Sequence, residues 1–199
     1  MPTILRAKCI VTGDAGVGKS SICQVFHSDS SHFPKNYTMT VGVELLVKPV
    51  NIPDTRDQVE LFLYDSAGKD VFSEQVTKFW EHPNLVMVVY DVTNEASFTN
   101  CVRWLERVYS VKPDVSLPGV LVANKTDLDQ RRVVSPKQGK ELALSKGLGY
   151  FECSADKVLI QNILGEVPWD VDNLSEKQLE LNHQDQIDHG MTNSSTAIL

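Results

Sequence analysis

Residues 13–20 constrain this chain more than any other stretch of its sequence. They run Gly-Asp-Ala-Gly-Val-Gly-Lys-Ser and fit the pattern G-x-x-x-x-G-K-[ST], whose glycines let successive backbone N–H groups converge on a phosphate. Residues 8–12 before this loop are typical of a short buried strand, and residues 21–26 after it are typical of the first turns of a helix. That order places a helix N-terminus under the phosphates. At this motif alone, a glycine-rich turn that only joins strand to helix stays open as an alternative.

The loop supplies most of the expected contacts to a nucleotide. Lys19 would place its ammonium on the β- and γ-phosphates, and the Ser20 hydroxyl would ligate Mg²⁺. The residues expected to bind the nucleotide here are Gly13, Asp14, Ala15, Gly16, Val17, Gly18, Lys19, Ser20 and Ser21.

Strand-like and helix-like stretches alternate along the rest of the chain. Residues 43–52 and 58–64 flank a turn-like segment and predict an antiparallel hairpin. Further apolar stretches predict strands at 85–90, 119–123 and 149–153. Apolar residues at helical spacing predict two helices: 96–111, with Phe98, Val102, Leu105 and Val108 inward, and 136–146, with Leu142 and Ala143 inward. The predicted fold class is α/β, with a mostly parallel central sheet, one antiparallel edge strand and helices on both faces.

The charge of the chain divides it into two regions. The net charge is −7, and residues 158–199 carry six of these negative charges, so the remainder is nearly neutral. The sequence therefore lacks the excess of positive charge that is typical of nucleic-acid-binding proteins. A short apolar stretch at 158–164 is followed by Gly165 and Pro168, which stop a helix. We expect a nucleotide-binding domain at 1–157 and an acidic, largely disordered tail at 158–199.

The four cysteines form no C-x-x-C pair and lie in apolar stretches, which is typical of reduced, mostly buried thiols in an intracellular protein. No apolar run approaches the length of a membrane span. Because the last cysteine is Cys153 and position 2 is proline, neither prenylation of a C-terminal cysteine nor N-myristoylation is expected. Any membrane attachment would then come through a partner.

An acidic motif follows the strand predicted at 58–64. Asp65 stands three residues before Gly68, and an acid at the carboxyl end of a buried strand is how P-loop proteins hold Mg²⁺ through water. The Gly68 N–H could meet the γ-phosphate. A role for Asp65 as a simple turn or helix cap remains open at this point.

Residues 124–127, Asn-Lys-Thr-Asp, follow the strand predicted at 119–123 and are expected to bind the base of the nucleotide. The Asp127 carboxylate can accept two hydrogens from guanine, and adenine offers no such pair of donors. Asn124 would brace the phosphate loop, and the stem of Lys125 would lie over the base. At the end of the last strand, a backbone N–H of Ser154 or Ala155 could meet guanine O6.

With these motifs in order, the chain resembles the Ras superfamily of small GTPases from residue 8 to about 156. Residues 37–43 and 91–98 resemble Rab sequences, and in that resemblance Thr40 would ligate Mg²⁺ and sense the γ-phosphate. The metal ligands implied are Ser20, Thr40 and Asp65. Residues 65–69, 79–81 and 116–119 resemble Rab-like GTPases of the intraflagellar transport B complex. That resemblance implies GTP or GDP with Mg²⁺, a cytoplasmic and ciliary location, and a small β-sandwich protein partner.

Two positions depart from the family pattern. Lys69 stands where most members carry the glutamine that orients the attacking water, and an ammonium cannot accept a hydrogen bond as an amide can. We therefore expect slow intrinsic hydrolysis and no confident catalytic residue, although Lys69 could simply point to solvent. After Asp156, the long amphipathic terminal helix of the family has no counterpart, so we expect a shortened or replaced helix and reduced stability.

Several functions stay open on the sequence. The leading hypothesis is a GTP-binding switch of low catalytic power that works as a subunit of ciliary transport. A structural adaptor with a permanent or dispensable nucleotide is the main alternative. A conventional vesicle-trafficking Rab and a P-loop kinase or ATPase are less favoured.

Overall fold

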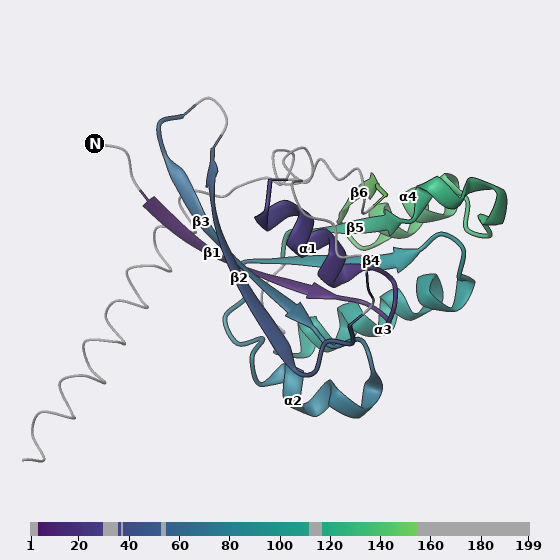
Figure 1. The fold of residues 1–199 in the computed structure, drawn as a ribbon, viewed down its shortest axis with the longest axis horizontal. Coiled ribbons are helices and arrows are strands. Elements are labelled where there is room, and N and C mark those ends of the chain that lie inside the picture. The colour runs from purple at the N-terminus through teal and green to yellow at the C-terminus, as the bar shows by residue number, and fades with distance from the viewer. Residues whose placement is uncertain (1–3, 30–35, 37, 53–54, 112–116, 155–199) are drawn as a thin grey trace, which may run out of the picture.

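The strands form a single central sheet, as the sequence predicted. The computed structural model describes residues 4–29, 36, 38–52, 55–111 and 117–154, and their six strands form one sheet in the order β2-β3-β1-β4-β5-β6 (Figure 1). The strands are β1 (Ile4–Thr12), β2 (Val43–Asn51), β3 (Gln58–Ser66), β4 (Leu85–Asp91), β5 (Gly119–Asn124) and β6 (Gly149–Glu152). Neighbouring strands are parallel except for the edge hairpin of β2 and β3. The predicted α/β class is confirmed.

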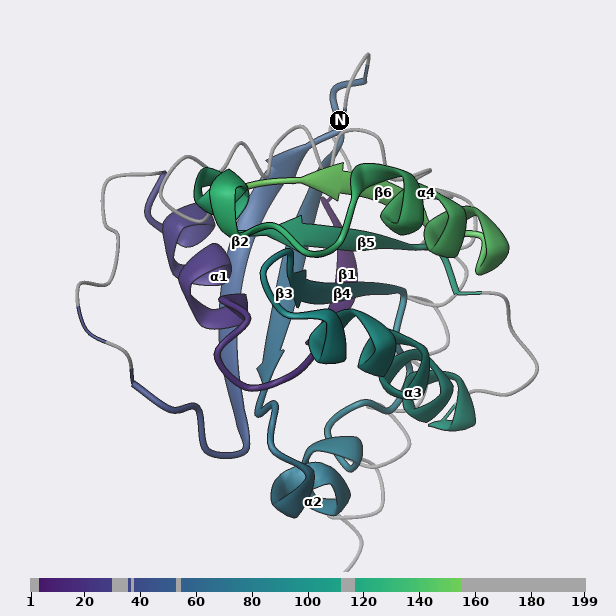
Figure 2. The same cartoon turned by 90° about the vertical axis from the view of Figure 1, so that its right-hand side faces the viewer.

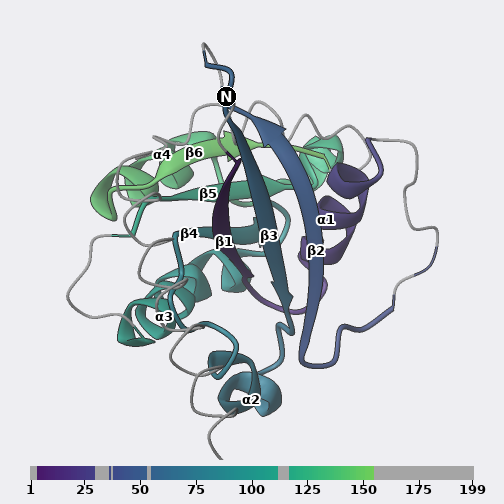
Figure 3. The same ribbon diagram turned by 90° about the vertical axis from the view of Figure 1, so that its left-hand side faces the viewer.

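The central strands are apolar because both of their faces are covered. Every residue of β4 and β5 is buried. One face packs against α1 (Lys19–His27), and the other packs against α2 (Ser73–Thr77), α3 (Glu95–Val111) and α4 (Pro136–Ser145). Figures 2 and 3 show α1 and α3 on opposite sides of the sheet. Short 3₁₀ turns occupy Asp70–Phe72 and Thr126–Arg131.

The boundary of β3 matters for the site. The sequence predicted that this strand ends at Tyr64, but the ladder continues for two more residues. Asp65 pairs in register with Val11 of β1, and Ser66 pairs with Val43 of β2. Asp65 is therefore held by the sheet itself, near the carboxyl end of β3.

Helix α3 buries more side chains than the prediction named. Its buried side chains are Ser97, Cys101, Trp104, Leu105 and Val108, whereas Phe98 and Val102 are half-buried. Phe98 packs against the buried core, with its ring centre 5.0 Å from that of Tyr90, so its predicted inward placement is confirmed, whereas Val102 is only partly buried. In α4, Ala143 is buried and Leu142 is half-buried, close to the prediction.

The topology gathers the predicted motifs at one edge of the sheet. Strands β1, β3, β5 and β6 are parallel, so their carboxyl ends lie at the same edge, where ligands of open α/β sheets bind. The phosphate loop, Asp65, Asn124 and Ser154 each follow or end one of these strands.

Some predictions fall outside the described residues. These are the tail at 158–199, the altered terminal helix, and Ala155. Among the described cysteines, Cys9, Cys23 and Cys101 are buried free thiols and Cys153 is a half-buried one. No helix in the described part of the chain is long and apolar enough to cross a bilayer.

Candidate nucleotide-binding site

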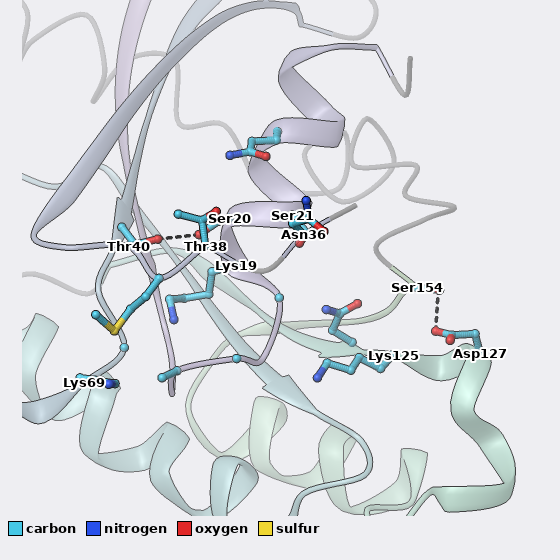
Figure 4. Close-up of a pocket in the computed structure, with 17 residues that line it drawn as sticks. Lys19, Ser20, Ser21, Asn36, Thr38, Thr40, Lys69, Lys125, Asp127 and Ser154 are labelled. Carbon is cyan, nitrogen blue, oxygen red and sulfur yellow. Dashed lines mark hydrogen bonds between the residues drawn. The ribbon is translucent and has the colours of Figure 1, made fainter. Parts of the chain in front are cut away.

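A cavity of about 410 Å³ lies at this edge of the sheet, within the size range of small-molecule sites (Figure 4). The predicted residues that line it are Ala15, Gly16, Gly18, Lys19, Ser20, Ser21, Thr40, Gly68, Lys69, Asn124, Lys125, Asp127 and Ser154. Gln24, Asn36, Thr38 and Met39 also line it and were not predicted. Gly13, Asp14, Val17 and Asp65 are not among the residues that line it.

The phosphate loop already holds its lysine in place. The Lys19 ammonium donates to the carbonyl oxygens of Gly13 and Asp14, at 2.8 Å each. Burial lowers the pKa of Lys19 to about 8, although Asp65 and Asp14 oppose the shift. Phosphate oxygens would supply the negative charge that this buried cation lacks.

Three oxygen-bearing side chains from distant segments converge beside Lys19. Ser20 Oγ donates to Asp65 Oδ2 at 2.5 Å, lies 2.8 Å from Thr40 Oγ1, and the Thr40 hydroxyl donates to the same carboxylate at 3.5 Å. The other oxygen, Asp65 Oδ1, is buried without a hydrogen-bond partner. Burial raises the pKa of Asp65, with Ser20 and Lys19 opposing the shift. A carboxylate with a bare buried oxygen beside two hydroxyls fits a hard divalent cation such as Mg²⁺.

The opposite end of the cavity carries the residues expected at the base. Asn124 is buried, and its amide donates to the Val17 carbonyl at 2.7 Å. This contact needs a glycine at position 18, where the backbone has φ +101° and a Cβ would lie 2.2 Å from the Asn124 amide nitrogen. The loop after β5 is thereby braced against the phosphate loop.

The acid expected to recognise the base is positioned by the loop after β6. Asp127 Oδ1 accepts from Ser154 Oγ at 2.7 Å, and both residues line the cavity (Figure 4). Lys125 has a left-handed backbone, with φ 67°, and its ammonium pairs with Asp91 Oδ2 at 2.7 Å. The sequence analysis missed Asp91, although its place at the end of a buried strand is a signal that could have found it.

The Asp14 side chain has a structural role that the sequence did not predict. Its carboxylate faces α3, where it accepts from Asn100 Nδ2 at 2.7 Å and from the Trp104 indole at 2.8 Å. The side chain therefore anchors the phosphate loop to a helix and does not reach toward phosphate. A carboxylate that faced the bound phosphates would repel them. An acidic residue inside a phosphate loop therefore indicates hydrogen-bond donors on the side of the loop that faces away from the phosphates.

Gly68 and Lys69 lie across the cavity from the base end. A Cβ on Gly68 would lie 2.4 Å from the Asp14 carbonyl carbon, so the start of this segment packs directly on the phosphate loop. Lys69 is exposed and lines the cavity (Figure 4).

Comparisons with known proteins agree with this geometry. Residues 8–167 match the family model described as Ras family. The chain is 57% identical over 154 residues to an intraflagellar transport protein 27 homolog of Bos taurus, covering 77% of this chain and 83% of that one. It is 44% identical over 155 residues to intraflagellar transport protein 27 of Chlamydomonas reinhardtii, covering 76% of each. It is 38% identical over 143 residues to Ras-related protein Rab-28 of Caenorhabditis elegans, covering 71% of this chain and 56% of that protein.

The matched region contains every motif that lines the cavity, and the relatives include Rab proteins and Rab-like proteins. Small GTPases of this family bind GTP and GDP with Mg²⁺. The phosphate loop, the three converging oxygens and the aspartate at the base end are the parts that this chemistry needs. The chain belongs to the Ras family of small GTPases and is Rab-like.

Proposed function

We propose that this chain binds GTP and GDP with Mg²⁺ and works as a Rab-like switch of low catalytic power. One observation carries the proposal: Ser20, Thr40 and Asp65 converge at one end of a cavity whose other end presents Asp127. Lys19 and the loop amides hold the phosphates, and Ser20, Thr40 and Asp65 hold the cation. The bound Mg²⁺ supplies neutralisation of phosphate charge.

The remaining proposed contacts belong to the base and the γ-phosphate. Asn124, Lys125 and Asp127 bind the guanine, assisted by a backbone N–H at 154 or 155, of which Ala155 lies outside the described residues. The Gly68 N–H and Thr40 respond to the γ-phosphate. The proposal assigns nucleotide binding to a domain at residues 1–157, which an acidic tail at 158–199 follows.

Slow hydrolysis follows from Lys69. Its ammonium carries three donors and no acceptor, so it cannot both donate to a phosphate and accept from the attacking water. The exposure of Lys69 at the rim of the cavity supports the proposal, because its side chain can reach the place that the family's glutamine serves.

We further propose that the protein acts as a subunit of the intraflagellar transport B complex in cilia or flagella. The names of its relatives, intraflagellar transport protein 27 and its homologs, support this role. Large apolar side chains are exposed around Thr40, along β2 and after Gly68, and such exposed side chains support a protein partner. We propose that this partner is a small β-sandwich subunit. These side chains are Met39, Val41, Leu45, Val47, Val71 and Phe79.

Competition binding tests the proposed ligand. A fluorescent GDP should be displaced by GTP and GDP, should resist ATP, and should dissociate faster when Mg²⁺ is chelated. Equal displacement by ATP would overturn the assignment of guanine.

A structural adaptor with a dispensable nucleotide is the second candidate, favoured by Lys69 at the position of the glutamine. Ser20→Asn separates the two candidates, because it removes a proposed cation ligand. If this variant lost GTP binding and still assembled with the partner, the adaptor would be the correct function. Loss of both would support the switch.

A further inference from the structure

Two segments carry the base end of the cavity, and direct hydrogen bonds join them. Asp127 lies in the 3₁₀ turn Thr126–Arg131, and Ser154 follows β6. Asp127 Oδ1 accepts from Ser154 Oγ at 2.7 Å (Figure 4), and the Thr126 amide donates to the Cys153 carbonyl at 3.2 Å. The relative position of the two segments therefore sets the position of the groups proposed to bind the guanine.

Strand β6 alone gives its segment little support. It is a four-residue edge strand, and its ladder to β5 runs from the pair Val120–Gly149 to the pair Ala123–Glu152. Its residues are exposed or half-buried, whereas every residue of β5 is buried. Short strands with few buried side chains open locally at a lower free energy than core strands do. Contacts from outside the ladder are therefore important for holding the end of β6.

Arg132, directly after the 3₁₀ turn, makes such a contact. Its Nη1 donates to Glu152 Oε1 at 3.0 Å and its Nη2 donates to Glu152 Oε2 at 3.3 Å, the two-bond geometry in which arginine binds a carboxylate strongly. Arg132 also donates to the Val134 carbonyl at 3.3 Å and to Asp129 Oδ1 at 3.2 Å. Because the Arg132 side chain is only 14% exposed, solvent screens its pair with Glu152 less than it screens a fully exposed pair.

Glu152 is held in turn by the core of the domain. The Tyr150 hydroxyl donates to Glu152 Oε1 at 2.7 Å and lies 3.5 Å from the hydroxyl of Tyr90, a fully buried residue of β4. Gly139 of α4 packs closely on both rings, since a Cβ there would lie 2.3 Å from a Tyr150 ring carbon and 2.7 Å from the Tyr90 hydroxyl. The carboxylate therefore offers Arg132 an acceptor at a defined position.

We infer that Arg132 is a positioning residue for base recognition, which acts through Glu152 to hold residues 153–154 against Asp127. This inference rests on the proposed function and concerns the guanine end of its site. When the pair is broken, the phosphate loop between β1 and α1 still binds the phosphates, but the base loses the alignment that its hydrogen bonds need. The pair therefore controls discrimination between bases in addition to affinity.

The ratio of the Kd for inosine diphosphate to the Kd for GDP measures that discrimination on the full-length protein with Mg²⁺. Inosine diphosphate lacks only the exocyclic amine of guanine, which is proposed to bind Asp127. Loss of one hydrogen bond to a carboxylate should weaken binding by the parent about tenfold or more. A globally destabilised protein binds both nucleotides more weakly by the same factor, because the unfolded chain binds neither, so instability alone leaves the ratio unchanged.

Glu152→Gln removes the charge and keeps the shape. We expect GDP to bind about 3- to 10-fold more weakly and the ratio to fall about threefold, as for the loss of a partly buried ion pair. Arg132→Met should have the same effect from the other side of the contact. The double variant should lose no more than Arg132→Met alone, because the two residues act through one contact.

Asp129→Asn is the matched control. It removes the other carboxylate that Arg132 binds, which lies on the same segment as the arginine and does not reach β6. The ratio should stay at the parent value in this variant.

Hydrogen exchange of the Thr126 amide in nucleotide-free protein gives a second measurement, because its bond to Cys153 joins the two segments. Exchange should be about three to ten times faster in Glu152→Gln than in the parent.

Two results overturn the inference. One is a ratio that stays at the parent value in both Glu152→Gln and Arg132→Met. The other is a fall in Asp129→Asn as large as that in Glu152→Gln. A parent that binds no guanine nucleotide counts instead against the proposed function. The Thr126 amide then still decides whether Arg132 holds the two segments together, and equal exchange in the parent and both variants shows that it does not.

Discussion

The Ser20 hydroxyl donates to the Asp65 carboxylate at 2.5 Å, across a sequence separation of 45 residues. Ser20 is the second residue of α1, and Asp65 is the last but one of β3, which pairs with β1, so the sheet fixes the carboxylate end of this contact. The second oxygen of Asp65 is buried and has no partner. This pair is the clearest sign in the structure of a place for a cation.

The Asp65 carboxylate should destabilise the protein when the cation is removed. Burial raises its pKa above the usual value of an aspartate side chain. A raised folded pKa means that stability falls as the pH rises from the unfolded value through the folded one, and the loss is complete above that window. Asp65→Asn should therefore raise the melting temperature of the nucleotide-free, chelated protein at pH 7, while the dependence of GDP affinity on Mg²⁺ should disappear.

The control for this variant is the pH dependence itself. The stability difference between Asp65→Asn and the parent should shrink as the pH is lowered toward 4, because the parent carboxyl then becomes protonated. A lower melting temperature for the variant at pH 7 without Mg²⁺ would contradict the account of a bare buried charge.

Lys69→Gln should accelerate GTP hydrolysis. The amide restores an acceptor for the attacking water together with a donor, and positioned groups of this kind contribute about 10²- to 10⁴-fold to a rate. We expect a gain of at least about tenfold in single-turnover assays. Lys69→Met is the control, since it removes the ammonium without adding an amide and should leave the slow rate in place. A Lys69→Gln rate no faster than the parent would show that Lys69 does not explain slow turnover.

Asp127→Asn should change the preferred base. Two hydrogen bonds from guanine to a carboxylate are charge-assisted, and loss of the charge should weaken GDP binding by about 10²-fold or more. An asparagine amide can instead donate to the C2 carbonyl of xanthine, so xanthosine diphosphate should bind more tightly than GDP. Ser154→Ala, which removes the 2.7 Å contact to Asp127 and keeps the carboxylate, should weaken GDP binding without changing the preference. An unchanged preference in Asp127→Asn would place the base elsewhere.

Gly68→Ala should impair recognition of the γ-phosphate selectively. The added Cβ meets the backbone of Asp14 and Ala15, so the segment must move away from the phosphate loop. Losing one hydrogen bond to a charged phosphate should weaken binding of a GTP analogue by about tenfold or more, with GDP affinity little changed. Calorimetric titration with both nucleotides measures this, and equal losses for the two would count against a γ-phosphate role for Gly68.

The sequence predicted the sheet and most of the cavity because the information is local. A phosphate loop, an acid after a buried strand and the stretch 124–127 each lie within a few residues, and parallel strands bring their ends together. The role of Asp14 could not be predicted in this way, since its partners Asn100 and Trp104 are 86 and 90 residues away. The same holds for Arg132 and Glu152, which lie on separate segments. Helix periodicity also left Cys101 and Trp104 out of the predicted inward residues, although both are fully buried.

The nucleotide that the protein carries when it is purified tests the central claim most directly. The protein is isolated with Mg²⁺ throughout, denatured, and the released nucleotide is identified and quantified against protein. The account predicts close to one guanine nucleotide per chain, with a measurable share of GTP because hydrolysis is slow, and predicts its loss from Ser20→Asn. An adenine nucleotide in its place, or an empty protein that also fails to bind added GDP, would contradict it.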